Sequence, residues 1–586
     1  MNLAEVKGAN HFTGSFLASW CVIDNVIEKH DDFASEIRGQ VNEIAANESI
    51  QAAVDWALAL ASAFKKLAKY PYLRGDIESR IRSICADSGM GLALDWFVDF
   101  ELRLLRLNTS FLTVESHNGA VVDEAQLMAD KCERQLLARL KEIRDQGRDG
   151  AYCMKSAERL AIAVCVGAGV EIPSVGDVSN KKEAMAALCA RLFDARWWRR
   201  QLRTLQARKL ESAARELGMV CKRRGGYCSI ATLRRRYDQK ARNRKLLELM
   251  EAENSEGQCY SLAELSDLGV SNPINRRNEL MTRIRGFEEV AEEVGGWTPA
   301  FITQTCPPRF HSHNRSGEQY EKWDGSSPRD AQVYFSEVWA KVRAAFAREN
   351  IIVFGFRVAE PHHDGCPHWH SLLWFPEHQL EKAMAIYQAY AMQDDPPAKV
   401  SVRFKVSIDE VANGATRYIA KYISKNVDGL KEDGAEWDAN VVKTAVRTEA
   451  WASTWGIRQF QQIGGPSVTV YREMRRIGDV VLDTEELENI RRSADEGNWK
   501  QFTLDMGGPV KPLKERPLRA WMAKKKDAAG ALVKNAYGEL IHVVRGLEAY
   551  GWLPIKTRLF EWVIRPIRRC VDVPREANAP PLDLCQ

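Results

Sequence analysis

The sequence lacks the features that define several large classes of protein. No apolar run reaches the about 18 residues of a membrane span, and the best one, 160–170, is broken by Gly167 and Gly169 and predicts a core helix. The 13 cysteines include no C-x-x-C pair, which argues against a disulfide framework or a zinc ribbon. The nucleotide-binding pattern G-x-x-x-x-G-K-S/T is also missing. We therefore expect a protein of a reducing cytoplasm, with no membrane contact and no nucleotide-driven motor of its own.

Length and composition are those of a globular chain with several domains. At 586 residues the chain is too long for one core, and its 45% apolar and 28% charged residues are ordinary values. Changes in composition suggest four ranges. These are a helical N-terminal region of unassigned role (1–190), a basic helical region (191–290), an α+β region (291–440) and a C-terminal region with basic patches and a loose tail (441–586).

Acidic residues are scarce in one stretch. Between 195 and 245 there are 17 Lys and Arg against 3 Asp and Glu, a local net charge of +14 in a chain whose total is +4. Acidic partners at i,i+4 are almost absent, and aromatic residues are interleaved, which is typical of a polyanion-binding surface. We use the name cationic ridge for the Lys and Arg side chains that are expected to contribute most of the charge of this surface. They are Arg234, Arg235, Arg236, Arg242, Arg244 and Lys245.

Histidines are few and gathered in one region. Seven of the 11 lie within 311–378, and His368 and His370 belong to a run, 366–375, that predicts a buried strand. Because side chains alternate along a strand, the two imidazoles project from one face about 7 Å apart and can bind one metal ion. Glu360, at the end of the preceding apolar run, is the expected third ligand. This ligand set suits several divalent ions, Zn²⁺ and Mn²⁺ among them.

The position of Glu360 depends on the turn before the histidine strand. A two-residue turn at Asp364–Gly365 would place Glu360 on the face opposite the histidines. Because Pro361 and Pro367 cannot donate ladder hydrogen bonds, we expect an odd-length loop or a bulge that restores Glu360 to the histidine face. His362 is the alternative ligand. A second His-x-His pair, 311–313, falls in a polar loop and is expected to bind no catalytic metal.

Tyrosines and lysines share one face of a predicted helix. The run 415–426 has helical periodicity and stops at Asp428–Gly429. At roughly 100° per residue, one arc of about 100° holds Tyr418, Lys421, Tyr422 and Lys425. A divalent ion and two lysines would favour the tyrosine phenolate and neutralise a phosphodiester. Together with the cationic ridge, this pattern indicates DNA strand transfer through a phosphotyrosine.

The predicted elements imply an α+β fold rather than a doubly wound sheet, because several strands have helices inserted between them. The expected strands are 297–305, 351–360, 366–375, about 400–406, and 468–471, with helices at 334–348 and 377–392.

These motifs resemble those of the HUH endonucleases, the rolling-circle replication initiators, and within them the replication gene A proteins of temperate tailed bacteriophages. Residues 301–309 are similar to the first motif, 360–370 to the metal-binding second motif, and 418–425 to the third motif in its two-tyrosine form. In the first motif, Gln304 and Pro308 stand where the resemblance leads us to expect a leucine and a serine.

The resemblance implies a site-specific nick at a replication origin in single-stranded or locally melted DNA, with Mg²⁺ or Mn²⁺ as cofactor. One tyrosine would become linked to the 5′ phosphate and free a 3′ hydroxyl for the host DNA polymerase, and the second would act in termination. A separate host helicase would unwind the duplex in the bacterial cytoplasm. The implied fold is a central antiparallel sheet with flanking helices beside the helical N-terminal region.

Two alternatives remain open from the residues themselves. A metal-dependent phosphodiesterase would use water as its nucleophile, and its tyrosines would be structural, so it would leave no covalent protein–DNA adduct. A non-enzymatic DNA-binding protein would hold a structural metal with the same histidines, and it would bind origin DNA without nicking it.

Overall fold

The computed structural model describes most of the chain in two compact units. The described residues are 14–29, 33–67, 73–107, 118–394, 400–411, 414–427, 439–478, 480–527 and 529–567. The first unit holds Met1–Ser174 and Met185–Ala214, and the second holds Val175–Ala184 and Arg215–Gln586. The four ranges expected from composition remain a prediction.

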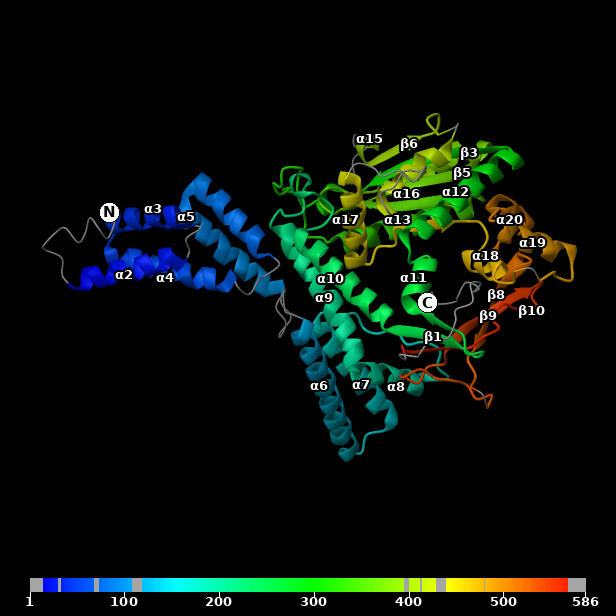
Figure 1. Ribbon diagram of the computed structural model, residues 1–586, viewed down its shortest axis with the longest axis horizontal. Helices are drawn as coiled ribbons and strands as arrows, with labels where there is room; N and C mark the ends of the chain where they lie inside the picture. Colours follow the sequence, from blue (N-terminus) through cyan, green and yellow to red (C-terminus); the bar gives the residue numbers. More distant parts are fainter. Residues whose placement is uncertain are drawn as a thin grey trace. The chain divides into compact units, whose positions relative to one another are not determined.

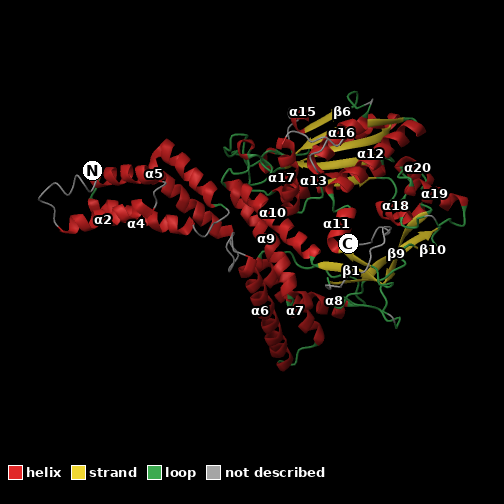
Figure 2. Cartoon of the chain, viewed as in Figure 1, coloured by secondary structure: helices red, strands yellow, loops and turns green. Residues whose placement is uncertain are grey.

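The first unit is helical, as predicted (Figure 2). Its helices, two of which extend into the second unit, are α2 (Gly14–Lys29), α3 (Ala34–Asn47), α4 (Ile50–Leu67), α5 (Arg74–Leu107), α6 (Asn118–Asp145), α7 (Gly150–Ala168), α8 (Lys181–Leu192) and α9 (Ala195–Glu216). In α7, Ala157, Ala161 and Cys165 are buried at helical spacing, whereas Val166 is 68% exposed. The expected core helix at 160–170 is therefore an amphipathic helix with one buried face.

The second unit is built on a five-stranded antiparallel sheet of order β6-β3-β5-β4-β7. The strands are β3 (Trp297–Thr305), β4 (Phe354–Pro361), β5 (Pro367–Pro376), β6 (Phe404–Ser407) and β7 (Phe460–Ile463). The expected α+β fold with a central antiparallel sheet is confirmed.

Helices cover both faces of this sheet (Figure 1). Alternate residues of β5 separate the two layers, because Trp369 and Leu373 belong to one buried cluster and Leu372 and Trp374 to the other. The first cluster is shared with α13 (Pro328–Arg348), α14 (Glu377–Ala391) and α17 (Ala439–Trp455). The second is shared with α12 (Pro273–Val294), α16 (Ala415–Val427), α18 (Val468–Arg475), α19 (Glu485–Asp495) and α20 (Trp499–Asp505).

Two of the expected strands are corrected. Residues 468–471, rich in β-branched side chains, lie in helix α18, where Val470, Tyr471 and Met474 are buried at helical spacing in the second cluster. Local β propensity is overridden there by the burial of one helical face. The strand expected at 400–406 is shorter, because its first residues form the one-turn helix α15 (Val400–Arg403).

Two smaller sheets complete the second unit. One has the order β10-β9-β8, with β8 (Leu518–Lys524), β9 (His542–Ala549) and β10 (Leu553–Lys556). The other has the order β11-β1-β2, with β1 (Met250–Asn254), β2 (Cys259–Ser261) and β11 (Trp562–Pro566). Helices α10 (Ile230–Glu248) and α11 (Leu262–Leu268) flank the strands β1 and β2 in sequence.

Among the helices that the structure describes, none is long and apolar enough to cross a lipid bilayer.

Gly355 in β4 provides a test of the sheet packing. Its φ is 149°, and a Cβ atom there would lie 2.1 Å from the carbonyl oxygen of Leu372 in β5. Gly355→Ala should therefore lower the free energy of unfolding of the second unit by about 3 kcal/mol, measured by denaturant titration. Gly508→Ala is the matched control, because Gly508 has a φ of 89° but open space around it. Gly508→Ala should lower the free energy of unfolding by only about 1–2 kcal/mol, through backbone strain. Equal decreases for the two variants would contradict the close packing at Gly355.

A candidate metal and tyrosine site

The register of β4 against β5 brings the predicted ligands to one face. Glu360 is paired directly with His368, and Val358 with His370, so all three predicted ligand side chains project from the same side of the sheet. The five-residue loop His362–Cys366 connects the strands and is closed by a 2.7 Å hydrogen bond from the His362 N–H to the Cys366 carbonyl. The odd-length loop expected from the two prolines is confirmed.

The tip of this hairpin is fixed by contacts from distant parts of the second unit. Buried Arg215 donates through Nε to the Asp364 carbonyl at 3.2 Å, and Trp451 of α17 donates through Nε1 to the Gly365 carbonyl at 2.8 Å. The Asp364 carboxylate accepts from the Ser312 N–H at 3.0 Å and lies 3.2 Å from His311 Nδ1. Burial alone would raise the pKa of Asp364, but the contact with His311 helps hold it well below its usual value.

The 311–313 histidine pair is thus part of the support of the hairpin. Ser312 and His313 are 0% and 3% exposed, which corrects the expectation of an ordinary polar loop. Neither histidine belongs to the group of converging ligand atoms that Glu360, His368 and His370 form. Their lack of a catalytic metal remains a prediction.

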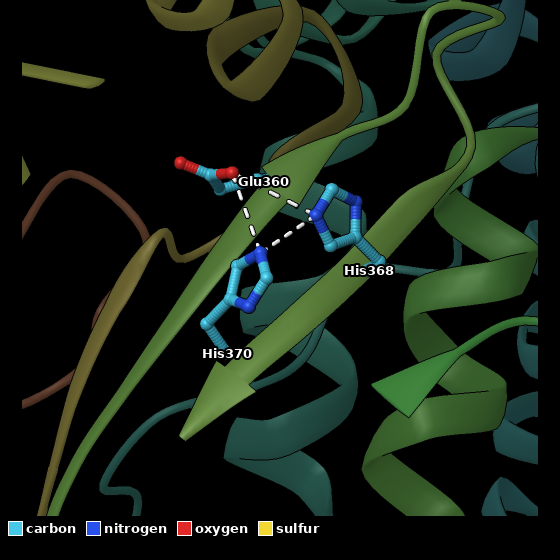
Figure 3. A group of neighbouring side chains, drawn as sticks. All are labelled: Glu360, His368 and His370. Atoms are coloured by element: carbon cyan, nitrogen blue, oxygen red, sulfur yellow. Dashed lines mark hydrogen bonds and ion pairs between the residues drawn. The ribbon is translucent and has the colours of Figure 1, made fainter. Parts of the chain in front are cut away.

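The side chains of Glu360, His368 and His370 point toward one another (Figure 3). The two imidazole Nε2 atoms are 2.8 Å apart, and Glu360 Oε2 lies 3.6 Å from that of His368 and 3.5 Å from that of His370. Bonds of about 2.0–2.2 Å to one divalent ion place neighbouring ligand atoms about 3–3.5 Å apart, so the group fits such an ion. In the described part of the chain, no other group of three His, Cys, Asp or Glu residues is this close.

The alternative ligand, His362, lies beside this group but outside it. Its ring centroid is 4.4 Å from that of His368, and it is absent from the set of converging ligand atoms. Burial, together with the neighbouring His311, lowers the pKa of His362 to about 4.

Two residues that the sequence patterns did not single out hold the ligands in place. Thr303 Oγ1 lies 3.0 Å from His370 Nδ1, which leaves Nε2 of that ring directed at the other ligands. Asn426, near the end of α16, donates through Nδ2 to Glu360 Oε1, so the other carboxylate oxygen faces the histidines. The pairing of Thr303 with His370 becomes known only from the β3–β5 register.

The tyrosine helix packs on the same face of the sheet. Ile419 and Ile423 are fully buried and dock α16, while the two tyrosines are half-buried. The ring of Tyr422 lies 4.1 Å from that of His370 and 5.5 Å from that of Phe301, and the ring of Tyr418 lies 4.9 Å from Phe301. The predicted common face of the two tyrosines is therefore the face that meets the histidine strand.

The two lysines of the predicted set stand apart from this packing. Lys421 is exposed on α16, and the side chain of Lys425 lies outside the described residues. The contribution of both to catalysis remains a prediction.

The protein alone disfavours the phenolate of both tyrosines. Burial, with the charge of Glu360 and the nearby Tyr418, raises the pKa of Tyr422 to about 12. A 2.9 Å hydrogen bond from the Tyr418 hydroxyl to Glu410 Oε2 raises the pKa of Tyr418. Any ionisation of Tyr422 at neutral pH therefore needs added positive charge.

The cationic ridge lies on α10 and is divided between two faces of that helix. Arg236 and Lys240 both pair with Glu449 of α17, and Arg244 pairs with Glu248 and Asp267. Acidic partners, which seemed almost absent from the local sequence, are thus supplied chiefly by distant parts of the chain. The ridge is therefore partly neutralised, a correction to the charge expected from the local count.

The other face of α10 keeps its charge. Arg234, Arg242 and Lys245 fall within about 80° of one another at 100° per residue, and all three are exposed. Within the described residues, none of them has an ion-pair partner. Arg235 is half-buried between the two faces.

The chain is similar over much of its length to replication proteins of bacteriophages. The replication gene A protein of Escherichia phage 186 is 34% identical over 489 residues, covering 80% of this chain and 69% of that one. The probable replication protein P12 of Pseudoalteromonas phage PM2 is 38% identical over 384 residues, covering 63% and 58%. A probable replication endonuclease from a prophage-like region of Salmonella paratyphi A is 30% identical over 414 residues, covering 66% and 50%.

An α+β unit with a three-ligand group beside a tyrosine helix thus lies in a chain related to phage replication proteins. The sequence pattern described as bacteriophage replication gene A protein (GPA) matches residues 123–430, a span that contains the whole candidate site. The chain belongs to that family. It spans between half and about two thirds of the length of the three relatives. No solved structure matches it.

The contact between Tyr418 and Glu410 gives a prediction about titration. The Glu410 carboxylate accepts a hydrogen bond from the Tyr418 hydroxyl and its charge opposes a phenolate, so Glu410→Gln should lower the pKa of Tyr418 toward the ordinary value of about 10. The measurement is a pH titration of ¹³C-labelled tyrosine by NMR, with Tyr418→Phe assigning the resonance. Tyr422 serves as the internal control. An unchanged midpoint for Tyr418 would show that this hydrogen bond does not form in solution.

Proposed function

We propose that this protein is a replication endonuclease of the HUH type, which nicks a replication origin through a covalent phosphotyrosine and so initiates and terminates rolling-circle DNA replication. One observation supports this most directly. The ring of Tyr422 lies 4.1 Å from the ring of His370, so a candidate nucleophile stands beside the three-ligand group. A hydrolase that uses water has no need of a tyrosine there. The names of the relatives, replication protein and replication endonuclease, agree with this proposal.

Glu360, His368 and His370 would hold the cofactor, Mg²⁺ or Mn²⁺. Bound there, the ion would polarise a phosphodiester and offset its negative charge. Thr303 and Asn426 keep two of the three ligands oriented through the contacts that they make with His370 and Glu360.

Tyr422 acts on the scissile phosphate from α16. Burial, with Glu360 and Tyr418, raises the pKa of Tyr422 to about 12. Positive charge from the bound ion would therefore be needed to favour loss of the phenol proton, which passes to solvent water as the oxygen attacks. The phenol oxygen forms a bond to phosphorus, the bond from phosphorus to the 3′ oxygen breaks, and that oxygen takes a proton. The products are a 5′ phosphotyrosine and a free 3′ hydroxyl, which a host polymerase can extend.

Tyr418 supplies the second nucleophile. It lies one helical turn from Tyr422 on the same face and contacts the same Phe301 ring. After a round of replication it would cut the regenerated origin and free a new 3′ hydroxyl. That hydroxyl would attack the phosphorus of the first phosphotyrosine, which joins the two DNA ends and releases the first tyrosine. Lys421 and Lys425 would contact the phosphates at this step.

The substrate is single-stranded or locally melted origin DNA. The open face of α10, with Arg234, Arg242 and Lys245, supplies phosphate contacts outside the catalytic centre. A host helicase would unwind the duplex and a host polymerase would extend the 3′ end, in the cytoplasm of the bacterial host.

Replacing the two tyrosines tests the covalent step. The double variant Tyr418→Phe, Tyr422→Phe keeps both rings and removes only the attacking oxygens, so it should bind DNA and Mn²⁺ normally but form no adduct. The measurement is a denaturing gel after incubation with a labelled origin oligonucleotide and Mn²⁺. Each single variant should retain some cleavage and fail to complete rejoining. An adduct with the double variant would identify another nucleophile, and nicking without an adduct would favour the hydrolase. A wild-type protein that binds this DNA and never nicks it would favour the non-enzymatic alternative.

The two faces of α10 give a prediction about salt. Replacing Arg234, Arg242 and Lys245 by Ala should weaken DNA binding regardless of sequence and reduce the slope of log affinity against log salt by about 0.7–0.9 for each phosphate that the variant no longer neutralises. The measurement is fluorescence anisotropy with a single-stranded oligonucleotide over a range of salt. Arg236→Ala with Arg244→Ala is the matched control, because these side chains are held in ion pairs, and it should change the slope far less. An unchanged slope in the triple variant would place this face away from DNA.

A further inference from the structure

One side chain joins the tyrosine helix directly to a predicted metal ligand. Asn426 is 3% exposed, and its Nδ2 donates both to Glu360 Oε1 in β4 and to the main-chain carbonyl of Tyr422 in α16. The two amide hydrogens therefore have two different acceptors. A carboxylate and a carbonyl can only accept, so the NH₂ group, and not the carboxamide oxygen, must face them.

This bridge constrains the carboxylate of Glu360. With Oε1 engaged by Asn426, the remaining oxygen, Oε2, lies 3.5 Å from His370 Nε2 and 3.6 Å from His368 Nε2. Glu360 itself is 3% exposed, so water has little access to replace the amide. The amide thus selects which carboxylate oxygen faces the imidazoles and stabilises the charged form that a cation needs.

The same bridge constrains Tyr422. Its carbonyl is the acceptor that a helix uses for the N–H four residues later, and the Asn426 side chain adds a second donor at that position. A movement of Glu360 would therefore reach, through one amide, the helix turn that carries the candidate nucleophile.

We infer that Asn426 is a positioning residue that couples occupancy of the metal site to the placement of the tyrosine helix. This inference rests on the proposed function for the presence of the metal, and it adds that the ion and α16 are ordered together. Side-chain bonding to a carbonyl four residues earlier also occurs in helices with no such role. The test must therefore separate coupling from a purely structural contact.

The first test is a double-mutant cycle on Mn²⁺ affinity, measured by electron paramagnetic resonance on the full chain without DNA. Asn426→Leu keeps the volume and removes the donor, and it should weaken Mn²⁺ binding about 10–100-fold. Glu360→Ala should weaken binding at least as much. Adding Asn426→Leu to Glu360→Ala should then change the affinity no further, because the amide acts through the carboxylate. If Mn²⁺ affinity in the double variant instead fell by the product of the two single effects, the inference would be overturned.

The second test follows α16 itself by hydrogen exchange. In the wild type, saturating Mn²⁺ should slow exchange of the backbone amides of residues 419–423. In Asn426→Leu at saturating Mn²⁺ this slowing should disappear, although the amides of β5 stay protected. Ser424→Ala is the matched control, because Ser424 is equally buried on α16 and, among the described residues, no hydrogen bond joins it to Glu360, His368 or His370. Metal-dependent protection of α16 that persists without Asn426 would contradict the coupling.

Failure of the metal site itself gives a different result. If the wild type and His368→Ala bound Mn²⁺ equally weakly, the proposed metal site would be wrong. A second outcome is that the wild type binds Mn²⁺ and His368→Ala does not, which would support the metal site. If Asn426→Leu then matched the wild type in both Mn²⁺ affinity and hydrogen exchange of α16, the role of Asn426 would be rejected.

Discussion

In an antiparallel strand pair, a shift of one residue moves every side chain to the opposite face of the sheet. The pairing of Glu360 with His368 is therefore the interaction on which the candidate site depends. If β4 were shifted by one residue against β5, the Glu360 carboxylate would point into the buried cluster around α13 and α17. The two imidazoles would then face α16 without the carboxylate beside them. Five loop residues set this register, and the buried contacts of Asp364 hold the loop.

The sequence patterns predicted the strand-borne part of the site well. Period-two alternation placed His368 and His370 on one face. The two prolines beside the turn, with Glu360 taken as a ligand, predicted an odd-length loop or a bulge, and the loop has five residues. The helical period of 415–426 placed both tyrosines on one face, and the structure shows that this face packs against the histidine strand. These successes share a cause, because each follows from the geometry of one element or one hairpin.

Features that depend on contacts between distant segments could not be predicted from the patterns. Thr303 supports His370 only because β3 pairs with β5, and Glu449 neutralises Arg236 only because α17 packs beside α10. Gln304, which departs from the related motif, faces the opposite side of β3 and accepts a hydrogen bond from Tyr387 at 3.2 Å. The departure therefore affects the packing of α14 rather than the ligand face. Residues 468–471 were misassigned for the same reason, since their burial in a helical face outweighs their local propensity.

The anchoring of the hairpin tip has a consequence for how the chain can be divided. Arg215 and Trp451, which hold the carbonyls of Asp364 and Gly365, lie outside the span 291–440 that contains all three motifs. A fragment cut at those boundaries would carry every predicted ligand and both tyrosines, yet it would leave two buried carbonyls at the tip without their donors. A fragment that keeps both donors has to extend at least from Arg215 to Trp451.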